Sequence, residues 1–145
     1  MRTTILPSML ETLTRNWNFR NKSVKLYELG RTYFPRADGL ADEPKTLCLG
    51  AYGPDMDFFA LKGAVEALLD GLRVPDVSYT AQGANPSYHP GRCADVYSGD
   101  RCLGVLGQIH PTVAATYGID GELYTAELSL DALLACAGPE PVYQP

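Results

Sequence analysis

The order in which helix-like and strand-like apolar patterns follow each other limits most strongly how this chain can fold. Apolar residues recur at helical spacing over residues 6–17 and 58–72, which predicts two amphipathic helices. Short apolar runs bounded by glycine and proline lie between and after them, and these predict strands. Because helices and strands do not alternate regularly, the order predicts an α+β fold with a largely antiparallel sheet, and not a doubly wound fold.

Local chemistry predicts where the helices begin. Ser8 and Glu11 have the spacing of a capping box at the start of the first helix. Asp57 is expected to cap the second helix, and Asp131 a short final turn. Gly63 lies inside the second helix, where glycine costs about 1 kcal/mol relative to alanine. We therefore expect Gly63 to allow close packing against a neighbouring element.

The predicted strands share an apolar run closed by turn-forming residues, and a tight hairpin at residues 98–100 joins two of them. They cover residues 24–30, 46–52, 77–81, 92–97, 101–109 and 123–128. Residues 31–34 either extend the first strand or return beside it, and residues 36–45 are predicted to be an exposed loop. Pro111 should open a short helix that Gly118 ends.

The chain of 145 residues fits one domain. We expect residues 1–138 to form that domain. Residues 139–145 are proline-rich and are expected to be an extended linker toward a further domain. No apolar run approaches the ~18 residues of a membrane span, so a cytoplasmic protein without a membrane partner is expected.

The formal net charge of −5 argues against a domain that grips nucleic acid through its overall charge. Phosphate binding needs a clustered basic surface. One local basic patch leaves two interpretations open, an RNA contact or a solvated helix end and loop. It comprises Arg15, Arg20, Lys22 and Lys25.

Cysteine usage predicts neither a metal site nor a disulfide framework. Cys48, Cys93, Cys102 and Cys136 form no C-x-x-C pair, and with two histidines no zinc spacing appears. Reduced, mostly buried thiols are expected. A thiol enzyme served by His89 or His110 is an alternative, although the thiols fall mainly inside predicted strands.

Residues 88–92 form the most function-like local segment, because they combine an aromatic ring, an imidazole and a guanidinium beside a glycine. One interpretation is the rim of a pocket that holds a small anionic ligand. The other is a proline-fixed loop in which His89 and Arg92 hydrogen-bond to neighbouring backbone or carboxylate groups. The residues alone leave both open.

Five stretches are more specific together than singly: Arg2-Thr3-Thr4-Ile5-Leu6-Pro7 and residues 26–33, 57–63, 89–92 and 103–111. Their order and spacing resemble the beta subunit of bacterial phenylalanyl-tRNA synthetase through Leu134. The resemblance implies structural or interface roles at its motif positions. These are Arg2, Pro7, Gly30, Arg31, Lys62, Gly63, His89, Gly91, Arg92, His110 and Pro111.

The resemblance implies a class II aminoacyl-tRNA synthetase-like fold, an antiparallel sheet flanked by helices, and makes this chain a fragment of that subunit. The family enzyme joins phenylalanine to its tRNA with ATP and magnesium, and it works as two alpha–beta pairs. The alpha subunit is therefore the implied partner, and tRNA is expected to bind through other domains. An independent small-ligand binding module with the same fold is the alternative.

The resemblance also implies that this domain is not catalytic. In the alpha subunit, the strand that resembles residues 30–33 continues with an arginine that contacts ATP, whereas Phe34 and then Pro35 stand here. Phenylalanine cannot neutralise a phosphate. A second ATP arginine is expected near residues 123–137, which contain none. We therefore expect no catalytic, cofactor-binding or metal-binding residue in this chain.

Overall fold

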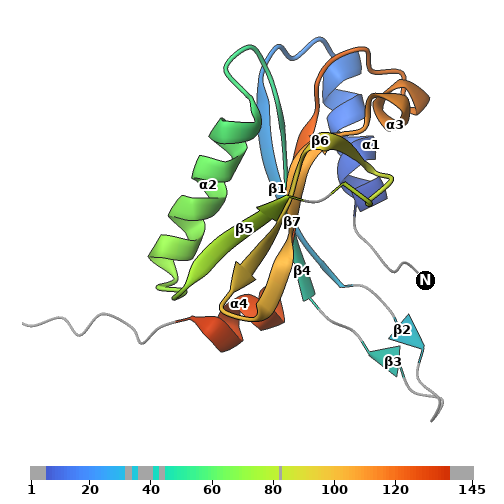
Figure 1. Ribbon diagram of the computed structural model, residues 1–145. Coiled ribbons are helices and arrows are strands. Elements are labelled where there is room, and N and C mark those ends of the chain that lie inside the picture. Colours follow the sequence, from blue (N-terminus) through green and yellow to red (C-terminus); the bar gives the residue numbers. More distant parts are fainter. Residues whose placement is uncertain (1–5, 32–33, 36–40, 43–44, 82, 138–145) are drawn as a thin grey trace, which may run out of the picture.

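A six-stranded antiparallel sheet organises the molecule (Figure 1). The computed structural model describes residues 6–31, 34–35, 41–42, 45–81 and 83–137. The strand order is β1 (Val24–Arg31), β4 (Lys45–Tyr52), β8 (Tyr124–Ser129), β7 (Arg101–Ile109), β6 (Tyr88–Ser98) and β5 (Val77–Ala81). Every neighbouring pair is antiparallel. The α+β class with an antiparallel sheet is thus confirmed.

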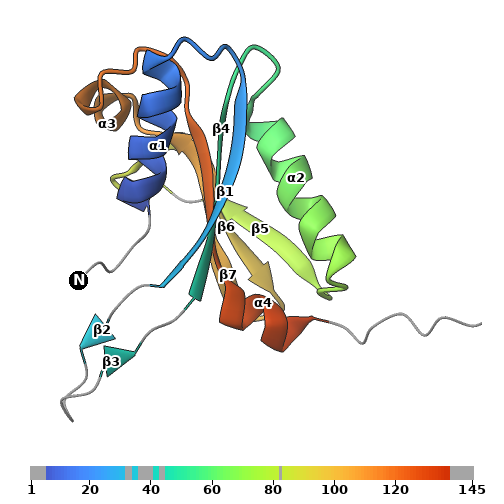
Figure 2. The ribbon, with the colours of Figure 1, turned by 180° about the vertical axis from the view of Figure 1, so that it is seen from behind.

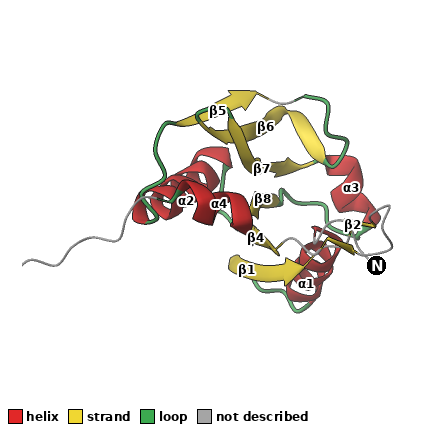
Figure 3. Ribbon diagram, turned by 90° about the horizontal axis from the view of Figure 1, so that it is seen from below, coloured by secondary structure: helices red, strands yellow, loops and turns green. Residues whose placement is uncertain are grey.

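Helices cover both faces of the sheet (Figures 2 and 3). One face carries α1 (Leu6–Asn18) and α3 (Pro111–Thr116), and the other carries α2 (Phe58–Gly71) and α4 (Leu130–Cys136). Each pair of helices closes its own hydrophobic core against the sheet. Since apolar burial is the main driving force of folding, these two cores hold the layers together.

A second, two-stranded ladder lies in the connection between β1 and β4 (Figure 1). It pairs β2 (Phe34–Pro35) with β3 (Ala41–Asp42). The predicted loop over residues 36–45 is therefore wrong in part, because Ala41–Asp42 is paired and Lys45 already begins β4. Residues 36–40 and 43–44 lie outside the described residues.

The predicted cap of α2 is present, whereas the predicted capping box of α1 is not. Asp57 caps α2 as predicted, since its Oδ1 accepts a hydrogen bond from the Ala60 amide at 2.7 Å. The predicted capping box of α1 is wrong, because Ser8 lies inside the helix that begins at Leu6. The Ser8 hydroxyl instead donates to Glu28 Oε1 at 3.1 Å. A tertiary hydrogen bond to β1 thus replaces the local one.

The cap of α4 also differs from the prediction. Ser129 caps this helix, and its Oγ accepts from the Ala132 amide at 3.2 Å. Asp131 lies in the first turn of α4, where its Oδ2 accepts from the Lys45 amide at 3.2 Å. The carboxylate therefore ties the first turn of α4 to the start of β4, which no local pattern predicts.

The hairpin and the short helix follow the sequence prediction. Ser98 pairs with Arg101, and Gly99 adopts φ of 57°, as a tight turn requires. Pro111 opens α3, and Gly118 follows it with φ of 80°. One boundary is wrong: β6 begins at Tyr88 and not at residue 92. The register shifts between Tyr88 and Cys93, so the start of this strand is irregular.

Gly63 does not have the close neighbour that was expected. It is exposed on α2, and a Cβ atom at this position would have no described atom within 4 Å. The predicted packing role is therefore wrong within the described part of the chain. The glycine retains its cost in helix propensity without a compensating contact.

We predict that Gly63→Ala raises the free energy of unfolding by about 1 kcal/mol, because alanine restricts the unfolded chain and fits the open space. Urea denaturation of the whole chain measures this change. Gly71→Ala is the matched control: this position is also open but ends the helix, so a smaller gain is expected. A loss of stability in Gly63→Ala would contradict the prediction.

Candidate functional site

The candidate site is a row of side chains that crosses the sheet beneath α1. Directly opposed residues on antiparallel strands point to the same face. The register opposes Glu28 to Cys48 and Cys48 to Glu127. It then opposes Glu127 to Val105 and Val105 to Asp95. Cys48 and Val105 pack in the core under α1, which places the row on that face. We call its carboxylates, Glu28, Glu127 and Asp95, the acidic row.

Buried hydroxyl groups hold the central carboxylate of the acidic row in place. The Tyr88 hydroxyl donates to Glu127 Oε2 at 2.9 Å, and the Thr125 hydroxyl donates to the Tyr88 oxygen at 2.9 Å. Tyr88 is 1% exposed and Thr125 is fully buried. Such a chain of satisfied hydrogen bonds orients the carboxylate rigidly.

Burial and the charges of the acidic row keep the neighbouring thiols of Cys48 and Cys93 protonated. Burial raises the pKa of the Cys48 thiol far above its ordinary value, and the charges of Glu127 and Glu28 raise it further. Burial and the charge of Asp95 raise the pKa of Cys93 to about 11. Because the thiolate is the reactive form, neither buried cysteine is suited to nucleophilic attack.

We predict that stability falls at alkaline pH. Burial and then the charge of Glu127 raise the pKa of Tyr88 well above its ordinary value of 10.0. A group with a raised pKa in the folded state stabilises the protein below its unfolded pKa, and this contribution is lost as the pH rises above 10. The slope should reach about 1.4 kcal/mol per pH unit for each such group. Urea denaturation on both sides of pH 10 measures it.

Tyr88→Phe should reduce that alkaline slope. At neutral pH it should also lower the free energy of unfolding by ~1–3 kcal/mol, because Thr125 and Glu127 each lose the hydrogen bond to the Tyr88 hydroxyl. Tyr27→Phe serves as the control, since this side chain is 73% exposed and its change should stay within about 0.5 kcal/mol. An unchanged slope in Tyr88→Phe would contradict the assignment.

The same face offers no positive charge in its described central rows. The row next to the acidic row contains Leu26, Gly50, Thr125, Gly107 and Cys93. On its other side lie Gly30, Thr46 and Ser129. These three described rows hold carboxylates but neither arginine nor lysine. These rows therefore contribute no described cation that could bind a phosphate.

The loop at the start of β6 is held by internal hydrogen bonds. His89 Nδ1 accepts from the Gly91 amide at 3.0 Å. Arg92 donates to Gln108 Oε1 at 2.7 Å and contacts Glu122 Oε1 at 3.3 Å. This is the arrangement of the second interpretation, in which neighbouring groups satisfy both side chains.

Arg92 also lines a hollow of about 500 Å³ between the start of α2 and β8. Asp57 and Glu122 line it as well, and Phe58, Phe59, Gly91 and Tyr124 complete it. Two carboxylates against one guanidinium make the hollow unfavourable for an anion. The pocket-rim geometry is therefore present, but the predicted anionic ligand finds no electrostatic support.

Comparison with known proteins shows which family the chain belongs to. The family model described as "Phenylalanyl tRNA synthetase beta chain CLM domain" matches residues 1–130. The chain belongs to the phenylalanyl-tRNA synthetase beta chain family. The Clostridium tetani "Phenylalanine--tRNA ligase beta subunit" is 41% identical over 146 residues, covering 99% of this chain and 18% of the relative. Its Geobacter sulfurreducens counterpart is 39% identical, covering 94% of this chain and 19% of that protein.

The chain thus spans about a fifth of the length of the beta chain relatives that it matches. A solved structure supports the class II fold independently. The pyrrolysyl-tRNA synthetase of Desulfitobacterium hafniense superposes with a TM-score of 0.75 at 16% identity, over 92% of this chain and 49% of that one. The predicted synthetase-like fold is therefore confirmed.

The motif positions that resemble the beta chain family do not gather at one site. Pro7 is exposed on α1, and Arg2 lies outside the described residues. Gly30 and Arg31 end β1, where they line a hollow of about 290 Å³ with residues of β4 and α4. Lys62 lies 4.6 Å from the centre of the Tyr79 ring.

The remaining family positions lie beside the loop already described. His110 caps α3, since its Nδ1 accepts from the Thr112 amide at 3.1 Å, and Pro111 is the first residue of that helix. Among the described family positions, His89, Gly91 and Arg92 form the largest group in one segment, while Gly30 and Arg31, Lys62 and Gly63, and His110 and Pro111 lie as separate pairs. No described group of three or more histidine, cysteine or acidic side chains is arranged to hold a metal ion.

Sequence reasoning missed the residues of the acidic row. Glu28, Asp95 and Glu127 lie on strands that are distant in sequence, and only the strand order brings them into line. The one available signal was Glu127 within an otherwise apolar strand. A charge that interrupts a central strand indicates a partner on one face of the sheet.

No described helix is long and apolar enough to span a membrane.

Proposed function

We propose that this chain is the catalytic-like domain of a phenylalanine–tRNA ligase beta subunit and that it performs no adenylation chemistry itself. The observation that carries this is the match of residues 1–130 to the beta chain family model, on a fold like that of a class II synthetase. The described central rows of the sheet face under α1 contribute carboxylates but no arginine or lysine. Adenylation needs positive charge around the transferring phosphate, which the described side chains of these rows do not contribute.

In this proposal the whole enzyme joins phenylalanine to its tRNA in the cytoplasm, with ATP and magnesium used by the alpha subunit. The assembly consists of two alpha–beta pairs, and tRNA binds mainly through other domains. Phe34 and Pro35 stand in place of one ATP arginine, and residues 123–137 lack the other. Family membership supports this function over the independent binding module.

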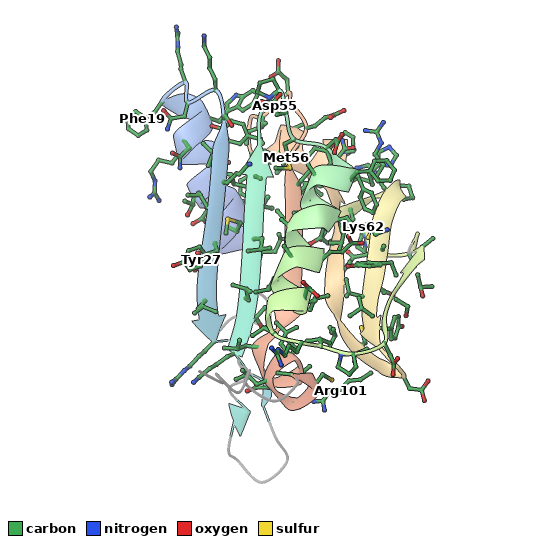
Figure 4. All side chains as sticks on the ribbon, turned by 90° about the vertical axis from the view of Figure 1, so that its left-hand side faces the viewer. Phe19, Tyr27, Asp55, Met56, Lys62 and Arg101 are labelled. Carbon is green, nitrogen blue, oxygen red and sulfur yellow. The ribbon has the colours of Figure 1, made fainter. Side chains whose placement is uncertain are left out.

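The domain's own role is to pack against the alpha subunit, and the surface beside β1 fits that role. Tyr27 and Leu29 on this strand are 73% and 59% exposed. Figure 4 shows the Tyr27 side chain at the edge of the sheet. β1 is an edge strand, paired only with β4 among the described strands. A largely apolar groove of about 260 Å³ runs beside it, lined in part by Leu49, Met56 and Leu61. Exposed apolar surface at a sheet edge marks a contact site.

Two measurements test the proposal. Calorimetry of the whole chain with ATP, magnesium and phenylalanine should show no binding, and saturable binding of an adenylate would overturn the non-catalytic role. Co-purification with the alpha subunit should succeed and should weaken at least tenfold in Tyr27→Lys, because a hot-spot aromatic contributes ~2 kcal/mol.

The control for the contact is Leu134→Lys, which changes a side chain that is 60% exposed on α4. It should leave the association with the alpha subunit unchanged. The same substitutions in a full-length beta subunit separate the loss of this contact from a general weakness of the shorter chain. Equal effects of both substitutions would contradict the assignment of the β1 surface.

A further inference from the structure

The turn that joins α1 to β1 carries an arginine where glycine is favoured. The Arg20 amide donates to the Trp17 carbonyl at 2.9 Å, and the Asn21 amide donates to the Asn16 carbonyl at 3.1 Å. This pair of bonds is a Schellman motif with Arg20 at its left-handed position, where φ is 62°. The motif needs only backbone groups, and a side chain disfavours it. The arginine side chain therefore does not serve the turn.

Positive charge concentrates around this turn. Residues 12–27 hold four cations and no acidic residue, in a chain whose formal net charge is −5. Arg15, Arg20, Lys22 and Lys25 are all exposed. None of the four side chains makes an ion pair or hydrogen bond with the part of the chain that the structure describes. Their charge is therefore available to a partner.

An aromatic ring stands among these cations. Phe19 is 76% exposed and points away from the body of the molecule (Figure 4). Lys22 and Trp17 also line a hollow of about 380 Å³ beside the turn. Asp55 lies in the neighbouring turn at the same end, and Glu122, which contacts Arg92, lines the same hollow, so two carboxylates stand near this group of four cations. An exposed ring among unpaired cations suits a base stacked beside its phosphates.

We propose that this basic turn, formed by Arg15, Phe19, Arg20, Lys22 and Lys25, binds RNA. The cations neutralise backbone phosphates, and Phe19 stacks on an unpaired base. The inference deepens the proposed function and rests on it for the presence of RNA. It assigns to this domain a direct RNA contact in addition to its contact with the alpha subunit.

Fluorescence anisotropy of the whole chain with a labelled single-stranded RNA, measured across a series of salt concentrations, tests the proposal. Binding should weaken as salt rises, with each phosphate contact adding ~0.7 to the log–log slope. Arg20→Gly should lower the affinity several-fold and reduce the slope by ~0.7. The same variant should raise the thermal unfolding midpoint, because glycine relieves the left-handed position. Phe19→Ala should weaken binding about tenfold at an unchanged slope.

The chain offers a matched control at the end of α2. Arg73 occupies the same left-handed position of a second Schellman motif, with φ of 58°. There the Val74 amide donates to the Leu69 carbonyl and the Arg73 amide to the Asp70 carbonyl, both at 3.0 Å. This turn lies at the opposite end of the molecule (Figure 1). Arg73→Gly makes the same chemical change and should leave RNA affinity unchanged.

The outcomes separate the two proposals. Equal weakening by Arg73→Gly and Arg20→Gly would overturn the site, because the effect would then follow net charge alone. Absence of RNA binding at low salt, with intact association with the alpha subunit, would overturn the RNA contact and leave the proposed function standing. Vesicles of anionic lipid that bind the turn without competition from RNA would also overturn it. Loss of the alpha association alone would count against the proposed function.

Discussion

Gly104→Ala is expected to lower the free energy of unfolding by ~3 kcal/mol or more, from a strained backbone and an overpacked contact. Gly104 adopts φ of 157° in β7. A Cβ atom there would overlap the carbonyl group of Glu127 and lie 2.9 Å from the Leu128 Cα. Both belong to the backbone of β8, in the middle of the sheet, so the obstacle cannot rotate away. Urea denaturation measures the change.

The matched control for this prediction lies in the same hairpin. Gly99 also has a positive φ, of 57°, but a Cβ atom there would have no described atom within 4 Å. Gly99→Ala should therefore cost only the left-handed backbone preference, about 1 kcal/mol. The difference between the two variants isolates the collision with β8. Equal losses in Gly104→Ala and Gly99→Ala would refute the steric argument.

Leu13→Ala should lower the free energy of unfolding by ~2–5 kcal/mol. Leu13 lies on α1 and is fully buried, in the core that this helix closes over the sheet. Its Cδ1 lies 3.1 Å from the place where a Cβ of Gly50 would stand, so helix and strand are in close contact. Alanine leaves a cavity that the rigid strand β4 cannot fill. Thermal and urea unfolding should both report the loss.

Leu134→Ala provides the comparison for this substitution. Leu134 lies on α4 and is 60% exposed, so its truncation should change the free energy of unfolding by no more than about 0.5 kcal/mol. If both leucine variants lose the same stability, burial under α1 is not the cause. A small loss in Leu13→Ala alone would mean that α1 collapses onto the sheet without a cavity.

The sequence predicted those features of the fold that depend on a few adjacent residues. Asp57 caps α2 because its carboxylate reaches an amide three residues away. The turn at residues 98–100 forms because glycine accepts a positive φ. In both cases the interacting groups are neighbours in the chain, so no knowledge of the strand order is needed.

Predictions were wrong where a distant partner competed with a local one. Ser8 bonds to Glu28 on β1, and Asp131 bonds to the Lys45 amide at the start of β4. Either contact becomes visible only after the sheet is assembled. The same reason hid the acidic row, whose members are aligned only by the successive pairing of β1, β4, β8, β7 and β6.

The resemblance predicted the absence of two ATP-contacting arginines, which stays a prediction, but it did not predict the acidic row. Phe34 and the arginine-free residues 123–137 were visible in the sequence. That carboxylates cross the same sheet face required the register of Glu127 with its neighbours.

The place of β8 in the sheet also decides when the domain can form during synthesis. β8 is the last in chain order of the described strands of this sheet, yet it lies between β4 and β7. Until residue 129 leaves the ribosome, β4 and β7 each present an unpaired edge beside incomplete apolar cores. The nascent chain therefore holds two half-sheets that cannot join, a state that is prone to aggregation and that a chaperone can protect. Completion of this one strand closes both halves together.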